Sequence, residues 1–320
     1  MSLVVELLRP PPHRGPLIAA GAVPLAVGLA LLEFRLQTRL SDPVHMALLL
    51  GAGALVFWLG VQAPNEEGMP PAYQSILIVT GLFLVFPGLL TAADVLGADF
   101  DGAPVGAVMW VSLVTGALAL WPAFERNSAI SLLLAALLGG VALLTAWWWL
   151  FDANSAAPYR WLLAAYSATL VLSSLALREP APRHAEVLID AGGLAVAAIP
   201  LVLNPWTFVF GGASLPGIWE VVLLGAGFGL VAFGALDRSP GPAYLGVLNL
   251  VLFILAVNGS ETATLYWWPL VLLAGGTLML VAGLRPRRPL PPEPAPYRAG
   301  EAPLASRADD DETVIRVRQD

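Results

Sequence analysis

The sequence lacks cysteine and lysine and has only three histidines in 320 residues. The absence of cysteine excludes disulfide bonds, thiolate catalysis and cysteine-ligated metals. A haem or zinc site would need more ligands than His13, His45 and His184 supply, and a lone histidine such as His45, near the start of an apolar run, is expected at the surface. All 16 basic residues are arginine, and alanine, glycine and proline are abundant, so we expect a GC-rich prokaryotic origin.

Catalytic signatures are missing as well. The sequence contains no phosphate-binding G-x-x-x-x-G-K-[ST] loop, no G-x-G-x-x-G turn before a helix, no G-x-S-x-G elbow and no H-E-x-x-H pair. These absences argue against nucleotide-binding, hydrolase and metalloprotease chemistry. We therefore expect a protein that is not an enzyme, binds no cofactor or metal, and has no nucleic-acid partner.

Charged residues make up only 12% of the chain, whereas hydrophobic residues make up 58% and the mean hydropathy is +0.75. Soluble domains carry about 25% charged residues, so this chain has too few charges to cover a water-facing surface. Its apolar runs are continuous, and they repeatedly reach the ~20 residues that a helix needs to cross the ~30 Å hydrocarbon layer. The composition predicts an all-α, multi-pass membrane helical bundle with the lipid bilayer as its first partner.

Ten apolar runs are candidate transmembrane helices. They divide the chain into a cytoplasmic N-terminal lead-in (1–16), a transmembrane domain (17–284) and a cytoplasmic tail (285–320) that is rich in proline and acidic residues and is expected to be disordered. The first and ninth runs are short and are flanked or interrupted by glycine and proline, so they are the least secure. The runs cover residues 17–34, 44–62, 75–96, 104–123, 128–151, 158–177, 186–203, 217–236, 241–257 and 266–284.

The placement of arginine predicts the orientation of these spans, because basic residues in short loops are retained on the cytoplasmic side. With the N-terminus inside, the loop arginines divide unequally between the two sides. We therefore predict a plasma-membrane protein with both termini in the cytoplasm. The inner arginines are Arg9, Arg14, Arg126, Arg178, Arg183, Arg238, Arg285, Arg287 and Arg288, and the outer ones are Arg35, Arg39 and Arg160.

Short words recur at a nearly constant offset. The word LLGAG occurs at 49–53 and 223–227, Pro-Ala-Tyr at 71–73 and 242–244, and Leu-Ile-x-Ala-Gly at 17–21 and 188–192. The offsets are 223 − 49 = 174, 242 − 71 = 171 and 188 − 17 = 171. Order and spacing together predict a parallel internal repeat in which spans one to four correspond to spans seven to ten. The alternative is that helical hairpins of biased composition converge on similar words.

Ionisable residues inside apolar runs are the usual indication of a functional site in a membrane protein. Asp190 and Glu186 have i, i+4 spacing at the start of the seventh span, so they share one helix face. One interpretation is a proton or cation relay at the cytoplasmic mouth, with Glu220 and Asp94 as further candidates. The alternative, which we favour, is that both acids stabilise a helix N-terminus through its dipole, with Arg183 close enough to neutralise them.

A second acidic group lies in a predicted outer loop. Asp99 and Asp101 form a D-x-D pair that follows Asp94. Such a pair can hold a divalent cation against a lipid-linked diphosphate, because hard oxygen ligands suit hard cations. Since the outer loops are short, we favour the alternative of a solvated acidic turn.

Tryptophan is concentrated near the predicted outer interface. Indole rings prefer the headgroup level of a bilayer, so this pattern predicts an aromatic belt. The alternative is an outward-facing aromatic pocket for a lipid or an apolar ligand. The residues concerned are Trp147, Trp148, Trp149, Trp161, Trp206, Trp219, Trp267 and Trp268.

Two functions remain open. The first is a non-catalytic structural or interaction protein of the membrane, whose partner is another membrane protein or a second copy. Close helix packing through small residues would support it, at Gly51, Gly53, Gly139, Gly140, Gly225, Gly227, Gly275 and Gly276. The tail matches an R-x-x-P-x-x-P ligand at Arg288, Pro291 and Pro294, which would suit a cytoplasmic tail-binding partner.

The second function is a small-solute or ion-coupled transporter. Transport predicts a polar cavity near the middle of the membrane that contains Asp190, Glu220 or Asp94. A scaffold predicts that these carboxylates lie at helix ends and face water.

Overall fold

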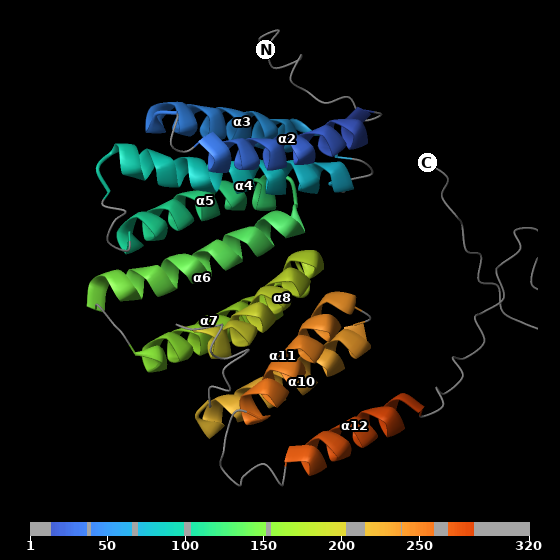
Figure 1. The fold of residues 1–320 in the computed structure, drawn as a ribbon. Coiled ribbons are helices and arrows are strands. Elements are labelled where there is room, and N and C mark those ends of the chain that lie inside the picture. Colours follow the sequence, from blue (N-terminus) through green and yellow to red (C-terminus); the bar gives the residue numbers. More distant parts are fainter. Residues whose placement is uncertain are drawn as a thin grey trace, which may run out of the picture. The chain divides into compact units, whose positions relative to one another are not determined.

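The computed structural model describes residues 14–36, 40–65, 70–98, 104–151, 155–202, 215–237, 239–258 and 268–284. Every regular element in these residues is a helix, as the composition predicts (Figure 1). The helices are α2 (Gly15–Leu36), α3 (Asp42–Gln62), α4 (Ala72–Val95), α5 (Val105–Glu125), α6 (Ala129–Phe151), α7 (Ala156–Leu177), α8 (Pro182–Ala198) with the short 3-10 helix η2 (Ile199–Leu201), α10 (Gly217–Asp237), α11 (Pro240–Asn258) and α12 (Trp268–Leu284).

Each of the ten predicted spans coincides with one of these helices. Within the described residues, nine helices are long and apolar enough to cross a membrane by length and composition. The helices α8 and α12 have 17 residues each and are the shortest of the described α-helices. The 3-10 helix η2 extends α8 by three residues. The boundaries agree to within about four residues, and the largest difference is at α8, which begins at Pro182 and not at residue 186. These helices indicate a multi-pass membrane protein.

Two helix ends show why the chain turns where it does. After α4, Gly97 adopts a φ of 92°, its N–H bonds to the Asp94 carbonyl, and the Ala98 N–H bonds to the Ala93 carbonyl. This pair of bonds is a Schellman cap, which requires a left-handed residue that glycine adopts without strain. After α5, Asn127 takes the left-handed conformation instead, with a φ of 55°. Asparagine tolerates this region better than other residues with a side chain.

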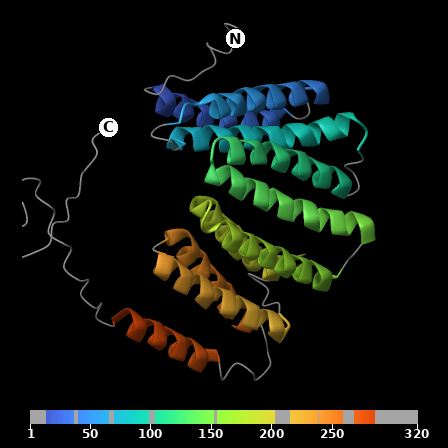
Figure 2. The same cartoon turned by 180° about the vertical axis from the view of Figure 1, so that it is seen from behind.

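The chain divides into two units, Met1–Pro269 and Leu270–Asp320, so α12 is described by itself. In the first unit, the helices pack in an order that largely follows the chain (Figures 1 and 2). The hairpins α3–α4, α5–α6, α7–α8 and α10–α11 contain the most extensive contacts, and α4 against α5, α6 against α8 and α8 against α11 join them. Most long-range contacts therefore connect helices that are close in sequence.

Glycines bring helix backbones together in two of these hairpins. A Cβ at Gly81 of α4 would lie 2.5 Å from the Phe57 N atom of α3, and one at Gly246 of α11 would lie 2.7 Å from the Val231 N atom of α10. No real Cβ approaches a backbone nitrogen so closely. The α3–α4 and α10–α11 contacts are therefore backbone contacts that only glycine permits.

The glycines expected to allow close packing fall into two groups. Gly53 and Gly227 lie against the partner helices, and Gly139 and Gly140 accommodate the Tyr166 ring of α7, whose hydroxyl donates to the Ala136 carbonyl. A Cβ at Gly51 or Gly225 would meet no atom within 4 Å. The expectation was thus wrong for these two as packing glycines, because their i+2 neighbours Gly53 and Gly227 point to a different side of the helix.

The glycine contacts give a direct test of hairpin packing. We expect Gly81→Ala and Gly246→Ala to lower stability by about 1–3 kcal/mol each, because the added methyl group forces two backbones apart. Gly51→Ala and Gly225→Ala are matched controls that fill open space and should leave the melting temperature unchanged or slightly higher, since alanine favours helix more than glycine does. Thermal unfolding of the purified protein in detergent measures the difference. Equal effects in both pairs would contradict the packing described.

Candidate functional site

A polar cleft of about 300 Å³ lies where α7 ends, α8 begins and α10 ends. The guanidinium of Arg178 donates to both oxygens of Asp237, at 2.8 and 3.1 Å, and forms a salt bridge with it. The Ser239 hydroxyl donates to the Glu186 carboxylate across the same cleft. These pairs connect three helices, although an ion pair whose side chains are 57% and 32% exposed contributes little to stability.

Asp190 lies beyond this cleft and packs against α11. Its carboxylate sits directly over Gly241, where a Cβ would come within 2.6 Å of Oδ2. The Oδ1 atom is buried and has no hydrogen-bond partner among the described residues. Asp190 thus touches α11 at a position where only glycine leaves room for a carboxylate.

The observed start of α8 removes one explanation for these acids. The helix begins at Pro182, so Glu186 is its fifth residue and Asp190 its ninth, and the first turn contains no acidic residue. The helix dipole acts mainly within the first turn. The favoured sequence interpretation, in which both acids stabilise the N-terminus, was therefore wrong, because the helix starts one turn earlier than the hydrophobic pattern predicts.

The four candidate acids are not brought together. Glu186 and Asp190 share one region of α8, whereas Glu220 is buried in the first turn of α10 and Asp94 is exposed in the last turn of α4. Glu220 and Asp237 belong to the same helix and are about 25 Å apart along its axis. Asp99 and Asp101 lie outside the described residues. Nothing in the described part of the chain groups three or more His, Asp or Glu side chains as metal ligands.

The described tryptophans lie at helix ends. Trp147, Trp148 and Trp149 are in the last two turns of α6, and Trp161 and Trp219 are near the starts of α7 and α10. The rings of Trp161 and Trp219 meet edge to face with centroids 4.9 Å apart, and Trp161 is 59% exposed while Trp219 is buried. The α7 and α10 starts are therefore at the same end of the unit. Trp206, Trp267 and the Trp268 side chain lie outside the described residues.

Several buried polar side chains were not singled out from the sequence. Asn249, in the middle of α11, is fully buried and donates from Nδ2 to the Gly193 and Leu245 carbonyls, but its Oδ1 has no partner. Gln74 of α4 and Ser112 and Thr115 of α5 are also buried, with side-chain atoms that lack partners. A single polar residue within an apolar run was the available signal. It does not indicate which side of the helix is covered.

His45 also differs from expectation. It was expected at the surface, but it is buried in the first turn of α3, and its Nε2 atom has no partner in the described structure. His184 is buried too, and its Nε2 atom lies 3.2 Å from the Ala123 carbonyl at the end of α5. Both histidines are covered by neighbouring helices, which a linear pattern does not reveal.

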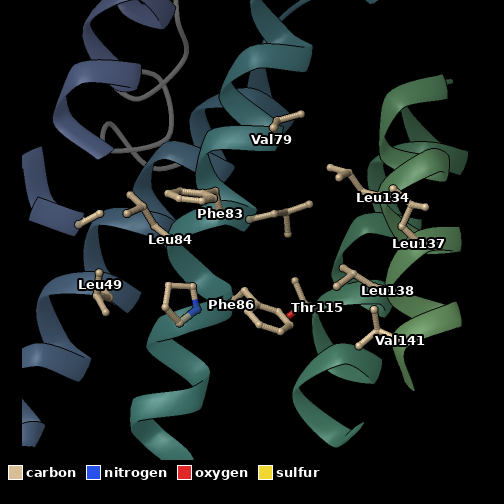
Figure 3. A pocket seen from close by; sticks show the side chains of 13 residues that line it. Leu49, Val79, Phe83, Leu84, Phe86, Thr115, Leu134, Leu137, Leu138 and Val141 are labelled. Atoms are coloured by element: carbon tan, nitrogen blue, oxygen red, sulfur yellow. The ribbon is translucent and has the colours of Figure 1, made fainter. Parts of the chain in front are cut away.

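One of the described cavities is apolar. It has a volume of about 540 Å³ and lies chiefly between α4, α5 and α6, with Phe83, Phe86, Thr115 and Leu138 among its lining residues (Figure 3). A second apolar cavity of about 460 Å³ is lined by residues of α2, α4 and α6. Val79 and Phe83 line both cavities. None of the candidate acids borders either cavity.

Serine hydroxyls connect α7 to α8, and the contribution of one of these hydrogen bonds to stability can be tested. Buried Ser174 donates to the Ala185 carbonyl at 2.7 Å. We expect Ser174→Ala to lower stability by about 1 kcal/mol, the usual net value of such a bond. Ser173→Ala, at the adjacent and only partly buried position, is the control and should change it by less than about 0.5 kcal/mol. Thermal unfolding measures both, and equal losses would show that the bond has no role.

Comparison with known proteins adds no relative to this description. No protein-family model, no curated protein and no solved structure matches the chain. Its function must therefore be argued from the geometry above.

Proposed function

We propose that this chain is a multi-pass protein of a prokaryotic plasma membrane that acts as a non-catalytic structural or interaction protein. One observation carries the proposal: the cavities beside the middle of the described helices are apolar, and no candidate acid lines them. Of the three carboxylates that a scaffold is expected to place in water at helix ends, Asp94 alone is exposed, whereas Glu220 is buried in the first turn of α10 and Asp190 packs against a neighbouring backbone. The apolar lining of the described cavities is therefore the feature that supports a scaffold over a polar transport path.

The exposed apolar surface supports placement in a bilayer. The spans in α2 and α7 are only 22% buried, and that in α6 is 28% buried. Phe83, Leu172 and Leu175 are among the large apolar side chains that are more than half exposed on helices of this unit. So much exposed apolar surface is unfavourable in water, whereas lipid chains would cover it. The helices also satisfy their own backbone hydrogen bonds, as hydrocarbon requires.

The proposed orientation places both termini in the cytoplasm. Arg178, Glu186 and Asp237 then lie on the cytoplasmic side with most loop arginines, while Trp161 and Trp219 lie at the outer interface. All three polar residues belong to helix ends that meet at one cleft, and both tryptophans belong to helix starts that touch each other. The partners we propose are the bilayer, a membrane protein or a second copy of the chain, and a cytoplasmic protein that binds the tail.

Reporter fusions test this orientation. A reporter that folds only in the cytoplasm should be active when fused after Asp320 or inserted after Arg126, and inactive when inserted after Asp101 or Asn154. The reason is the excess of arginine on the predicted inner side. Protease protection in spheroplasts provides the independent measurement. Activity of the reporter after Asp101 would contradict the proposal.

We also propose that the repeat of spans one to four in spans seven to ten arose by duplication, and its first three pairs, α2, α3 and α4 with α8, α10 and α11, can be compared within one unit. In both groups the last two helices form a glycine-packed hairpin, and within the group the first helix contacts the second helix of that hairpin more extensively than the first. Gly53 and Gly60 correspond to Gly227 and Gly234 at the offset of 174. The hairpin registers differ, since Gly53 faces Val85 but Gly227 faces Leu250. The shorter connection of residues 238–239, compared with 63–71, accounts for this shift.

The two groups differ in polarity at corresponding positions. At the offset of 171, Asp190 corresponds to Ala19 and Asn249 to Ile78. Ala19, Ile78 and Asn249 are all buried. The second group has therefore acquired polar side chains where the first is apolar. This asymmetry, together with the unpartnered Asp190 Oδ1, favours ion-coupled transport as the second candidate function.

Flux measurements separate the two functions. For a scaffold, we expect proteoliposomes with wild-type protein to show no proton- or sodium-driven flux above protein-free liposomes, and Asp190→Asn to behave identically. The reason is that neither Asp190 nor Glu220 lines any of the three cavities described above. A pH-sensitive dye and radioactive sodium provide the readout. A flux that Asp190→Asn abolishes and Asp94→Asn preserves would establish the transporter instead.

A further inference from the structure

The polar cleft at the ends of α7 and α10 contains charges of both signs that a ligand can reach. Its charged lining residues are Arg178, Glu186 and Asp237, so the cleft carries one positive and two negative formal charges. The side chains of Arg178 and Asp237 are 57% and 32% exposed. A molecule outside the protein can therefore contact the guanidinium and the carboxylate directly.

The polar groups of the cleft keep hydrogen-bonding capacity for a ligand. Both bonds from Arg178 to Asp237 come from Nη2, although a guanidinium also donates from Nε and Nη1. The Oε1 atom of Glu186 accepts the bond from the Ser239 hydroxyl. A carboxylate can accept about four hydrogen bonds, which is more than the bonds described for either acid. The cleft thus offers both N–H donors and carboxylate acceptors.

This combination of charges selects a zwitterion with a primary amine. The planar guanidinium matches the oxygen atoms of a phosphate group. The two carboxylates repel an anion that carries no positive charge, whereas they accept hydrogen bonds from the N–H groups of an ammonium. Phosphoethanolamine contains a phosphate and a primary ammonium in one headgroup. A choline headgroup has the same charges but no N–H to donate.

The surroundings of the cleft favour a lipid over a soluble zwitterion. Leu175, Ile189 and Phe233 also line the cleft. Leu175 is 54% exposed, and Leu172, one turn earlier on the same face of α7, is 66% exposed. The cleft therefore borders the apolar outer surface of α7. An acyl chain can lie along this surface while its headgroup occupies the cleft.

The depth and size of the cleft also suit a headgroup. Arg178 directly follows α7, Asp237 is the last residue of α10, and Ser239 directly precedes α11. These three helices are long and apolar enough to cross a membrane, and their ends would lie at the headgroup level, outside the ~30 Å hydrocarbon layer. The volume of about 300 Å³ is at the lower limit of small-molecule sites, about 300–1,000 Å³. The cleft therefore takes a headgroup and not a whole phospholipid.

From these observations we infer that the cleft between α7, α8 and α10 binds the headgroup of phosphatidylethanolamine. The phosphate accepts hydrogen bonds from Arg178, and the ammonium donates to Glu186 and Asp237. An acyl chain lies along Leu172 and Leu175. The inference rests on the membrane placement in the proposed function, but not on the scaffold role or the orientation. It concerns binding alone, and no reaction is included.

The first test varies the lipid and leaves the protein unchanged. Lipids with identical oleoyl chains are titrated into the full-length protein in detergent micelles, and native mass spectrometry counts the bound lipids. We expect one saturable phosphatidylethanolamine site, with an affinity about tenfold higher than that for phosphatidylcholine, the equivalent of one hydrogen bond to a charged group. Monomethylated and dimethylated headgroups should fall between the two in that order, because each methyl group replaces one N–H. Equal affinities across the series would overturn the inference.

The second test removes each charge of the cleft in turn. Arg178→Gln should weaken the binding of both lipids about tenfold, because both contain the phosphate. Glu186→Gln should weaken phosphatidylethanolamine alone and lower its preference over phosphatidylcholine to less than about threefold. A merely structural role of Glu186 would change both affinities alike, so a preference that persists in Glu186→Gln would also contradict the inference. Melting temperatures show that the variants remain folded.

A matched variant and a soluble competitor complete the experiment. Glu179→Gln removes an exposed carboxylate that does not line the cleft and should leave both lipid affinities unchanged. Glycerophosphoethanolamine has the same headgroup without acyl chains, and it should displace the lipid only at concentrations about a hundredfold higher, since it loses the apolar contact with Leu172 and Leu175. Competition at equal concentrations would identify a soluble ligand instead of a lipid. Reporter fusions test the membrane placement separately, so a failure of either is recognised by itself.

Discussion

Backbone contact between helices at glycine is the constraint on which the described unit depends. Lipid chains are as apolar as leucine, so apolar side chains alone give helices little reason to associate in a membrane. Close approach at Gly81 and Gly246 instead brings whole backbones into van der Waals contact. The two hairpins formed in this way give the helices between them fixed neighbours. α5 packs against α4, and α8 packs against α11.

Polar groups are used sparingly between these helices. Ser167 and Ser174 of α7 donate to the Gly192 and Ala185 carbonyls of α8, and Asn249 donates to Gly193. Each bond joins a side chain to the backbone of a neighbouring helix. The ionic contact of Arg178 with Asp237 is instead at a helix end, where water and headgroups solvate it. Burial of a charge in hydrocarbon would cost several kcal/mol, which explains this separation.

Polar side chains with buried atoms that lack a hydrogen-bond partner occur in both halves of the unit, but in different surroundings. Around α8 and α11, Asp190 and Asn249 occupy positions whose counterparts are the apolar Ala19 and Ile78. Around α4 and α5, Gln74, Ser112 and Thr115 are buried, and their side chains have polar atoms without partners among the described residues. The duplication that we propose would allow such divergence, because one copy retains the packing while the other changes.

The sequence by itself determined the helices. Ten apolar runs predict ten helices at nearly the observed bounds, because hydrocarbon crossing demands both length and continuous hydrophobicity. The same runs give no direction for each side chain, because a helix that is apolar all round has no distinguishable face. Tertiary structure alone decided that His45 and Thr115 are buried, that Gly53 contacts a neighbour while Gly51 does not, and that Glu186 and Asp190 lie apart from Glu220. These facts depend on which helices are neighbours and how each is rotated about its axis, and a one-dimensional pattern contains neither quantity.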